Sequence, residues 1–441
     1  MFTIIYAGTL ALTGDQFVYL SSHPALAYPS LSDHALKVEV VAKELSFPTT
    51  MAFLGPDDIL VLEKNNGTVR RILNGNMLSD PVLDVNIANK YERGMLGVAV
   101  LPNELQSHQN QTTSVFLYYT EADKEGSDVC PTSRRCVSEH KQLNNRLYRY
   151  DFVNGKLINP TLLLEFPANP IPAHNGGKMV IGPDKNVYFT IGDLNYRTNT
   201  QNFPNRTDSN GTSGIYRITE DAKAVQPVLG NEHPLDKYYA YGIRNSFGID
   251  FDPVTGRLWD TENGPAFGDE INLIEPGFNS GWRKVQGIWD VQKTSAPEGG
   301  INSTDLDKKV RFNPVNLEDF GGKGNYSSPE FTWFNPTAPT AIVFLDSDKL
   351  GNKYQNDIFV GTYKQGNIYH FELNQNRTGL DLDGPLLDKV ANVTIEAEDV
   401  KFGEGFGAIT DIQVGPYDGY LYIVSHGRQG EIYRIVPATV S

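Results

Sequence analysis

One short phrase recurs along this chain. It consists of a Gly-Pro-Asp or Asp-Pro turn, a short β-rich strand, a polar loop, and a second strand of the form Ile-Tyr-Arg-Ile. Apolar and polar residues alternate within these strands, as in half-buried antiparallel strands, and long helical periodicity is absent. An internal repeat with several strands per copy indicates a propeller, whose sheets pack on one another around a channel. The copies cover residues 55–73, 114–152, 182–218, 252–274, 354–373 and 415–437.

These six copies predict an all-β fold, a six-bladed β-propeller of four-stranded antiparallel blades. Propellers routinely form one large domain, so we expect a single domain over residues 36–438 after an N-terminal segment 1–35. The leading sequence KVEVVAKEL is expected to supply an outer strand that closes the ring with the last blade. Long loops are expected at 120–145, 195–212 and 285–330.

The charge of the chain restricts its partners. The formal net charge is −15 and the isoelectric point is near 5.0, whereas binding to nucleic acid requires a basic face. Apart from a short, interrupted apolar run near the N-terminus, no segment is apolar enough to span a bilayer. We therefore expect a small-molecule ligand, no nucleic acid and no stable membrane span.

Several features favour an extracytoplasmic location. The apolar run FTIIYAGTLALTG precedes Ala25-Leu26-Ala27, a small-residue sequence typical of a leader cleavage site, although the basic n-region of a signal peptide is missing. Cys130 and Cys136 bracket a short loop, and a disulfide there fits an oxidising compartment; two free thiols are the alternative. We expect a secreted or surface-exposed glycoprotein. Glycosylation sequons occur at Asn66, Asn110, Asn205, Asn210, Asn302, Asn325, Asn376 and Asn392.

Two segments restrict function more than the rest of the chain. Residues 241–282 read YGIRNSFGIDFDPVTGRLWDTENGPAFGDEINLIEPGFNSGW, with an Arg-Asn pair, an Asn-Gly-Pro turn, an Asp-Glu-x-Asn sequence and a Gly-Trp end. Upstream lies AHNGGKMVIGPDKNVYFTIGD, which contains His174. Together these segments resemble the glucose/sorbosone dehydrogenase family, enzymes that oxidise sugars with pyrroloquinoline quinone (PQQ).

The resemblance implies a catalytic group at three positions. His174 aligns with the family's catalytic base, and a neutral imidazole suits removal of a hydroxyl proton. Asp193 resembles the carboxylate that orients this histidine; a turn-forming Asx residue is the alternative. Arg244 corresponds to the arginine beside the quinone carbonyl, where its charge stabilises the oxyanion, and Asn245 follows it at a cofactor-binding position. An arginine paired with a carboxylate between blades is the alternative for Arg244.

The resemblance also implies a calcium site. Gly264 and Pro265 match positions whose backbone carbonyls hold the cofactor-linked Ca²⁺, for which oxygen ligands are suitable. Asp269 and Glu270 follow, either to support a second, structural calcium ion or to anchor the turn. Lys364, in GTYKQGNIY, corresponds to a lysine that contacts the cofactor.

The chain departs from the family pattern at the residues expected to hold the carboxylates of PQQ. Family members usually have an Arg-x-Arg-Asp sequence near the last blade, and Ala408 and Thr410 occupy the two arginine positions here. Loss of two charged hydrogen bonds is expected to weaken binding by about two to four orders of magnitude. Glu92 occupies a cofactor-binding position where relatives commonly have Gln, and its carboxylate would repel the cofactor. Other cations would have to compensate, and the candidates are Arg93, Lys401 and Arg428.

Three functions remain open at this point. The first is oxidation of aldose sugars at the C1 hydroxyl to the lactone, with PQQ and Ca²⁺ as cofactors and an unidentified electron acceptor. The second is a non-catalytic propeller that binds a glycan or a protein, because fold alone does not secure function and the arginines are missing. The third is a calcium-dependent lactonase with Asp193, Glu262 and Asn263 around the metal, although this would leave His174 and the Arg-Asn pair unexplained.

Overall fold

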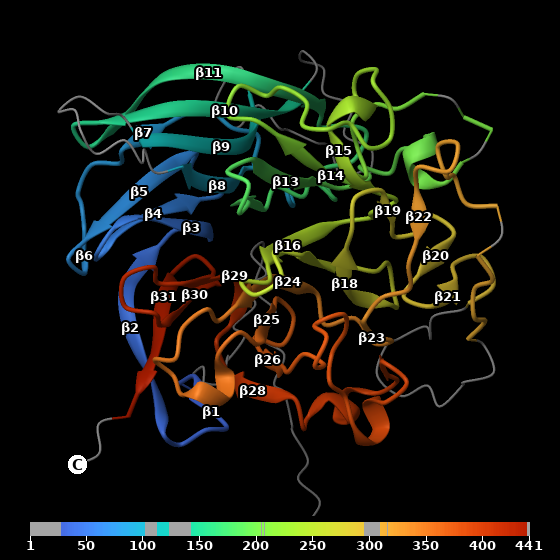
Figure 1. Cartoon of the computed structure of the whole chain (residues 1–441). Helices are drawn as coiled ribbons and strands as arrows, with labels where there is room; N and C mark the ends of the chain where they lie inside the picture. Colours follow the sequence, from blue (N-terminus) through green and yellow to red (C-terminus); the bar gives the residue numbers. More distant parts are fainter. Residues whose placement is uncertain are drawn as a thin grey trace, which may run out of the picture.

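The structure, a computed structural model, describes residues 28–101, 113–122, 143–203, 205–206, 208–294, 309–314 and 316–438. Its strands form six sheets of four to six strands each, together with a two-stranded ribbon, arranged around a central axis (Figure 1). Residues 1–27 of the expected N-terminal segment, Cys130 and Cys136, and the sequons at Asn110 and Asn302 lie outside the described residues. The predicted all-β propeller is confirmed.

Three of these sheets begin with β3, β8 and β12, and in each the strands follow one another outward from the centre. The first sheet contains β3 (Pro48–Gly55), β4 (Asp58–Glu63), β5 (Thr68–Leu73) and β6 (Asn76–Met77), with β7 (Leu83–Asp84) also paired to β5. The second contains β8 (Met95–Leu101), β9 (Thr113–Glu121), β10 (Asn144–Val153) and β11 (Lys156–Pro167). The third contains β12 (Met179–Ile181), β13 (Val187–Ile191), β14 (Gly214–Ile218), β15 (Tyr238–Tyr241), β19 (Phe278–Asn279) and β22 (Asn325–Tyr326).

The other three sheets begin with β16, β24 and β29, and two of them add a strand from the N-terminal part of the chain. The fourth sheet contains β16 (Ser246–Phe251), β17 (Leu258–Glu262), β18 (Asp269–Ile274), β23 (Phe331–Trp333) and β27 (Val390–Ala391). The fifth contains β24 (Pro339–Phe344), β25 (Ile358–Thr362), β26 (Ile368–Phe371), β28 (Lys401–Glu404) and β1 (Ser30–Leu31). The sixth contains β29 (Ala408–Val414), β30 (Leu421–His426), β31 (Gly430–Pro437) and β2 (Leu36–Leu45), and the ribbon pairs β20 (Val285–Gln286) with β21 (Trp289–Asp290).

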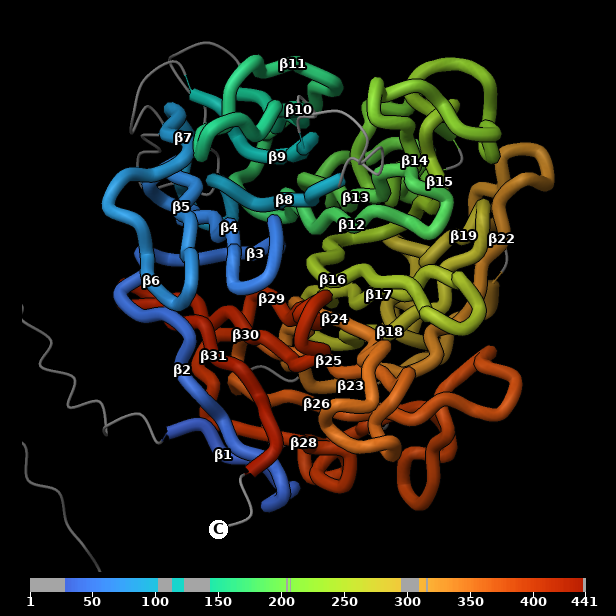
Figure 2. The backbone as a smooth tube through the Cα atoms, turned by 60° about the vertical axis from the view of Figure 1, so that its left-hand side comes forward, coloured from blue at the N-terminus to red at the C-terminus, as the bar shows by residue number. Residues whose placement is uncertain are grey.

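The ring closes as the sequence predicts. The innermost strands contact one another in the order β3, β8, β12, β16, β24, β29 and again β3. Strand β2 pairs antiparallel with β31, from Leu36 opposite Pro437 to Leu45 opposite Gly430, and Figure 2 shows these two strands side by side. Because β2 and the other strands of this sheet lie at opposite ends of the chain, their hydrogen bonds hold the first and last parts of the domain together.

The details of the sheets differ from the prediction in two ways. Two sheets have four strands as expected, but the other four carry additional short strands, and the pairs β15–β19, β19–β22 and β23–β27 are parallel. The segment expected to be a long loop at 285–330 contributes β20, β21 and β22 within its described part. Two-residue strands leave almost no alternation in the sequence, so periodicity could not reveal them.

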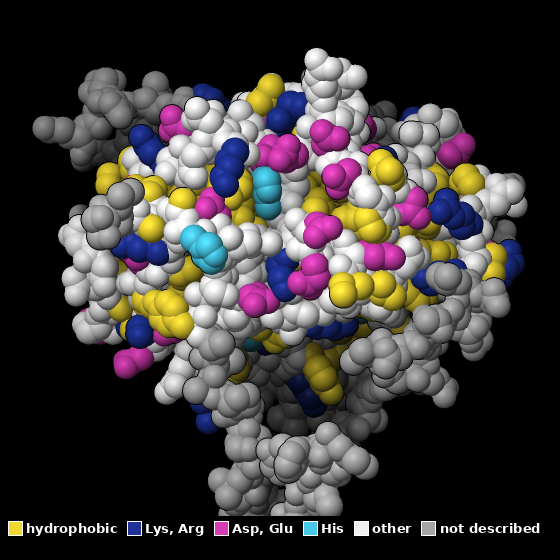
Figure 3. Space-filling model, turned by 90° about the horizontal axis from the view of Figure 1, so that it is seen from below, with side chains coloured by type: hydrophobic (Ala, Val, Ile, Leu, Met, Phe, Trp, Pro, Cys, Tyr) yellow, Lys and Arg dark blue, Asp and Glu magenta, His cyan; other side chains and the backbone are white. Residues whose placement is uncertain are grey.

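The hydrophobic core fills the space between neighbouring sheets. Between the second and third sheets, buried aromatic side chains interlock, with the rings of Phe189 and Tyr216 stacked 5.0 Å apart and Phe166 edge-on to Tyr216 at 5.2 Å. Burial of each large apolar side chain stabilises the fold by roughly 1.5–3 kcal/mol. On the outer face seen in Figure 3, basic side chains are interspersed with acidic and hydrophobic ones.

Candidate active site

A cavity of about 500 Å³ opens at one end of the ring, within the size range of small-molecule sites. Asp193 lies behind His174 rather than on the cavity wall, and Glu270 lies in the interior of the fourth sheet. The predicted site residues that line the cavity are Glu92, His174, Arg244, Asn245, Gly264, Pro265, Asp269 and Lys364.

The backbone around His174 fixes where its side chain lies. His174 is in the loop between β11 and β12, with a φ of 62° in the left-handed region. Its backbone N–H donates to Glu92 Oε2 at 2.6 Å. Gly192 packs against the same loop, and a Cβ at Gly192 would lie 2.3 Å from the His174 carbonyl oxygen. Only glycine permits this close approach, which brings the end of β13 against the histidine loop.

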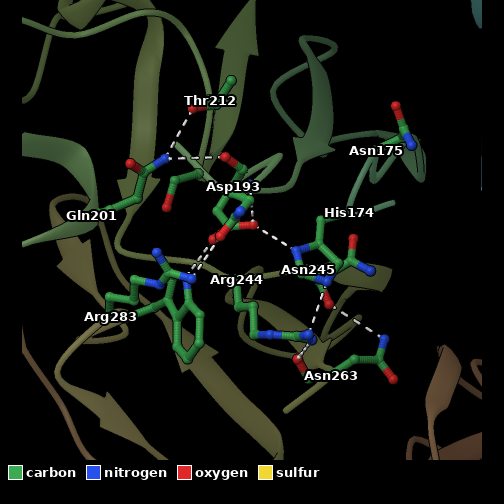
Figure 4. Close-up of polar contacts among 12 residues, drawn as sticks. His174, Asn175, Asp193, Gln201, Thr212, Arg244, Asn245, Asn263 and Arg283 are labelled. Atoms are coloured by element: carbon green, nitrogen blue, oxygen red, sulfur yellow. Dashed lines mark hydrogen bonds and ion pairs between the residues drawn. The ribbon is translucent and has the colours of Figure 1, made fainter. Parts of the chain in front are cut away.

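The imidazole of His174 is held from both sides (Figure 4). Nδ1 lies 2.6 Å from Asp193 Oδ1, and Nε2 lies 2.8 Å from Arg244 Nη2. A guanidinium can only donate hydrogen bonds, so Nε2 must accept and the proton of the neutral ring must be on Nδ1, facing Asp193. The lone pair of Nε2 therefore accepts from Arg244, which lines the cavity, and a substrate hydroxyl would have to displace this contact before Nε2 could act as a general base.

Asp193 has no exposed surface and is held by three donors. Besides His174, its Oδ1 accepts the Asn195 backbone N–H at 2.9 Å and its Oδ2 accepts Trp282 Nε1–H at 2.7 Å. Burial raises the pKa of Asp193, but the hydrogen bonds from His174, Asn195 and Trp282 outweigh burial and leave the pKa below its ordinary value. Asp193 is thus an ionised carboxylate that orients the imidazole, in addition to forming a turn.

Arg244 joins the histidine to the predicted calcium-binding turn. Its Nη1 donates to the carbonyl oxygens of Asn263 at 2.7 Å and Gly264 at 3.0 Å, while its guanidinium lies 5.4 Å from the Trp282 ring. Burial lowers the pKa of Arg244, and nearby carboxylates, Asp193 first among them, act in the opposite direction. An arginine remains cationic in proteins, so it places a fixed positive charge beside His174.

Glu92 and Asn245 form a second polar contact on the other side of the histidine loop. Glu92 Oε2 accepts both the His174 backbone N–H and Asn245 Nδ2–H, the latter at 3.2 Å. The Glu92 carboxylate, which we expected to repel a cofactor, therefore also has a structural role, since it fixes the backbone of His174. The Oδ1 atom of Asn245 is buried without a hydrogen-bond partner.

The Asn-Gly-Pro turn lines the cavity, its Asn263 and Gly264 carbonyl oxygens accept from Arg244, and Asp269 anchors it. Both oxygens of Asp269 accept backbone N–H groups, Oδ1 from Gly264 at 2.8 Å and Oδ2 from Thr337 and Ala338 at 2.7 Å each. Burial is the largest influence on the pKa of Asp269 and raises it, although these N–H donors oppose the effect. Through these contacts, Asp269 anchors the Asn-Gly-Pro turn.

Glu270 belongs to a buried cluster of carboxyl groups. Glu262 and Glu270 lie opposite each other on β17 and β18, and the Ser280 hydroxyl is 2.6 Å from Glu262 Oε2 and 3.2 Å from Glu270 Oε2. Burial raises the pKa of Glu262 to about 8 and that of Asp260 to about 7. Burial also raises the pKa of Glu270 well above its ordinary value. The cluster is therefore largely protonated near neutral pH.

The cavity provides oxygen atoms for a cation, but few carboxylates. Asn263 Oδ1 and Asn245 Oδ1 are buried without partners, and Gly264, whose carbonyl accepts from Arg244 Nη1 at 3.0 Å, also lines the cavity. Within the described ranges, no group of three or more His, Cys, Asp or Glu side chains could hold a metal ion. A hard cation such as Ca²⁺ would fit carbonyl and amide oxygens completed by ligand oxygens. The lactonase alternative is not favoured, because Asp193 and Glu262 are engaged by His174 and Arg244.

The predicted replacements for the missing arginines lie elsewhere. Arg93 is buried and donates to the carbonyl of Ala168, Lys401 pairs with Glu398 and Glu404, and neither these two nor Arg428 lines the cavity. Thr410 does line it, as its alignment implies, while Lys364 lies at the rim with Nζ 3.3 Å from the Pro336 carbonyl.

Sequence reasoning did not assign several cavity residues. Lys64 and Lys178 line the cavity, as do the tyrosines Tyr91 and Tyr363, while Trp282 lies behind it and holds Asp193. The Gly-Trp end of the 241–282 segment was a signal for Trp282. Lys178 lies in the AHNGGK sequence that contains His174, whereas Lys64 follows a repeat strand where no short motif distinguishes it from other lysines.

Fold and cavity together define a β-propeller whose end cavity holds a carboxylate-backed histidine beside a fixed cation. The chain belongs to the glucose/sorbosone dehydrogenase family, whose sequence model matches residues 45–434. It is 24% identical over 409 residues to the aldose sugar dehydrogenase YliI of Escherichia coli, covering 91% of this chain and 93% of that protein. It is 25% identical over 389 residues to quinoprotein glucose dehydrogenase B of Acinetobacter calcoaceticus, covering 76% and 77%.

Solved structures show the same fold. The apo form of the soluble aldose sugar dehydrogenase of Escherichia coli superposes with a TM-score of 0.65 at 21% identity, over 91% of this chain and all of that chain. The PQQ-bound aldose sugar dehydrogenase of Streptomyces coelicolor gives 0.60 at 21% identity, over 92% of this chain and all of that chain. Among the described residues, no helix has the length and apolar character to cross a membrane.

Proposed function

We propose that this chain oxidises aldose sugars at the C1 hydroxyl to the lactone, with PQQ and Ca²⁺ as cofactors. The observation that carries the proposal is the position of His174, whose Nε2 is 2.8 Å from Arg244 and whose Nδ1 is 2.6 Å from an ionised, fully buried Asp193. Membership of the family and the printed activities of its relatives support the substrate class.

Each residue has a defined part in this proposal. PQQ, when bound, supplies the two-electron acceptor that takes the hydride from C1. His174 Nε2 accepts the proton of the C1 hydroxyl, and Asp193 stabilises the imidazolium that forms. Arg244 contributes its charge where negative charge develops on the acceptor. Gly264, Pro265, Asn245 and Lys364 are the residues that we assign to the cofactor and its cation.

The experiment is reconstitution of the apoprotein with PQQ and Ca²⁺, followed by reduction of an artificial dye with a panel of aldoses. We expect aldose-dependent turnover, and a decrease of about 10²–10⁴-fold in kcat for His174→Gln. His233→Gln is the matched control, because the side chain of His233 is 70% exposed. Folded wild-type protein that shows no turnover at saturating cofactor would reject the proposal.

One observation favours a second function. Ala408 and Thr410 provide no positive charge for the carboxylates of PQQ, and a propeller that has lost its cofactor would serve as a binding module. A ligand that binds the native state raises its melting temperature. A melting temperature that is unchanged by saturating PQQ and Ca²⁺ would support this non-catalytic function.

A further inference from the structure

Ala408 and Thr410, which occupy the two arginine positions of the family, lie at the start of β29, next to the end of β30. Ala408 lies opposite His426 in the register of these strands. Thr410 Oγ1 donates to the Pro48 carbonyl at 3.2 Å, and His426 Nδ1 contacts the same oxygen at 2.9 Å. Since a carbonyl only accepts hydrogen bonds, Nδ1 of His426 must carry a proton. The other ring nitrogen, Nε2, is then free of the Pro48 contact.

Lys64 approaches the same wall from the end of β4. Its backbone N–H donates to the Phe47 carbonyl at 3.0 Å, and the Phe47 ring lies 5.4 Å from the His426 ring. The Lys64 ammonium donates to Asn65 Oδ1 at 2.8 Å and to the Asn89 carbonyl at 3.2 Å. Lys64 is 8% exposed and lines the cavity together with His426 and Thr410. The pair Phe47-Pro48 thus organises a cation, an imidazole and a hydroxyl into one wall.

The other cations of the cavity are engaged differently. Lys178 forms an ion pair with Asp411, which has no exposed surface and also accepts the Thr50 hydroxyl at 2.7 Å. Arg244 is bound to His174 and two backbone carbonyls. Lys364 is at the exposed rim. Lys64 donates to two amide oxygens and reaches the wall of Thr410 and His426 through the adjacent residues Phe47 and Pro48.

We infer that Lys64 and His426 form a relocated anion anchor, which binds a carboxylate of the cofactor in place of the two arginines. The inference rests on the proposed function. Lys64 supplies the charge, His426 supplies Nε2–H when protonated, and Thr410 adds a neutral polar surface. Buried, preoriented donors bind a carboxylate more strongly than flexible surface lysines do, because less side-chain freedom is lost on binding.

The anchor has a specific electrostatic consequence. In the structure, burial lowers the pKa of His426, and the nearby charge of Lys64 lowers it further, while the hydrogen bond to Pro48 opposes both effects. A carboxylate at this wall favours the imidazolium, because an opposite charge stabilises the protonated form. Binding must therefore raise the pKa of His426, whereas a ligand held elsewhere in the cavity would leave it nearly unchanged.

The test compares Lys64→Met and Lys64→Arg with the wild type, with Lys43→Met as the charge-matched control on β2, where the Lys43 side chain is 62% exposed. PQQ is titrated into apoprotein with Ca²⁺, and Kd is followed by quenching of intrinsic fluorescence. We expect Lys64→Met to weaken binding about 10- to 150-fold, from the loss of one charged hydrogen bond. Lys64→Arg should stay within a few-fold of the wild type, and Lys43→Met should be unchanged.

A second probe separates this inference from the proposed function. Benzene-1,3,5-tricarboxylate carries carboxylates but no quinone, and ¹⁵N-histidine spectra report its effect on His426, assigned with His426→Gln. PQQ binding that is equal in wild type and Lys64→Met would overturn the anchor and leave the dehydrogenase proposal intact. A tricarboxylate that raises the pKa of His426 only when Lys64 is present, without PQQ binding, would support the anchor and reject the dehydrogenase. If neither ligand binds the wild type, both are rejected.

Discussion

The buried carboxylate behind the histidine allows a sharp prediction for Asp193→Asn. Asp193 accepts hydrogen bonds from His174 and Asn195 through one oxygen and from Trp282 through the other. An asparagine has one accepting oxygen and one NH₂ group that donates. If its oxygen faces His174, its NH₂ meets the Trp282 N–H; if it faces Trp282, its NH₂ meets Nδ1 of His174. In the second case the proton of His174 moves to Nε2, which then faces the donor of Arg244.

Either orientation leaves at least one buried donor without a partner. A buried, unsatisfied donor costs about 1–3 kcal/mol, so we expect the free energy of unfolding to decrease by about that amount. Trp282→Phe removes one of the two conflicting donors. In the double variant, the asparagine oxygen can face His174 without a donor clash, so we expect a coupling of about 1–3 kcal/mol between the two substitutions.

The assay is denaturant unfolding of the apoprotein for the four members of this cycle, with the exposed Asp80→Asn as a control. Histidine ¹⁵N spectra report the tautomer of His174 in each variant. Neither measurement depends on cofactor loading or on turnover. Additive effects of Asp193→Asn and Trp282→Phe, with the Nδ1–H tautomer unchanged in both single variants, would refute the reasoning about shared donors.

Two further predictions concern buried charges away from His174. Burial raises the pKa of Asp260 from 3.8 to about 7, so the free energy of unfolding of the wild type should fall by about 1.4 kcal/mol per pH unit as pH rises through this range. Asp260→Asn removes this titration and should flatten the pH dependence. Urea unfolding across that range checks this, and unchanged slopes would contradict it. Lys178→Met should lower the free energy of unfolding by about 3–5 kcal/mol, because Asp411 is left buried without its cation. Adding Asp411→Asn should recover part of the loss, measured by the same unfolding assay, and no recovery would disprove the ion-pair explanation.

The parts of the fold that the sequence predicted are those with strong local patterns. The repeated strands gave the propeller, and KVEVVAKEL was rightly expected to pair with the last blade. Strands β2 and β31 are ten and eight residues long and rich in β-branched residues, which carries enough signal for such a prediction. The two-residue strands and the parallel pairs were missed, because long-range contacts, rather than local sequence, specify them.

The candidate site divides in a similar way. Motif positions led to His174, Asp193 and Arg244, and the structure brings the three together. The three candidates for compensating cations, Arg93, Lys401 and Arg428, do not line the cavity. Whether a lysine at a strand end points into the channel depends on the twist of its sheet and on the next blade. A single sequence does not contain that information, so Lys64 could not be distinguished from a solvated lysine.

The polar contacts of the site cross the seams between sheets, and this explains how the cavity is kept in order. Glu92 precedes the second sheet, His174 begins the third, and Arg244 leads into the fourth, yet the three are joined by direct hydrogen bonds or through Asn245. Each blade contributes one member, so relative movement of two blades would break a buried contact, at a cost of about 1–3 kcal/mol. The contacts that orient the imidazole therefore also hold neighbouring blades together. In the proposed reaction, a histidine that is held in place before the ligand arrives would need little reorganisation.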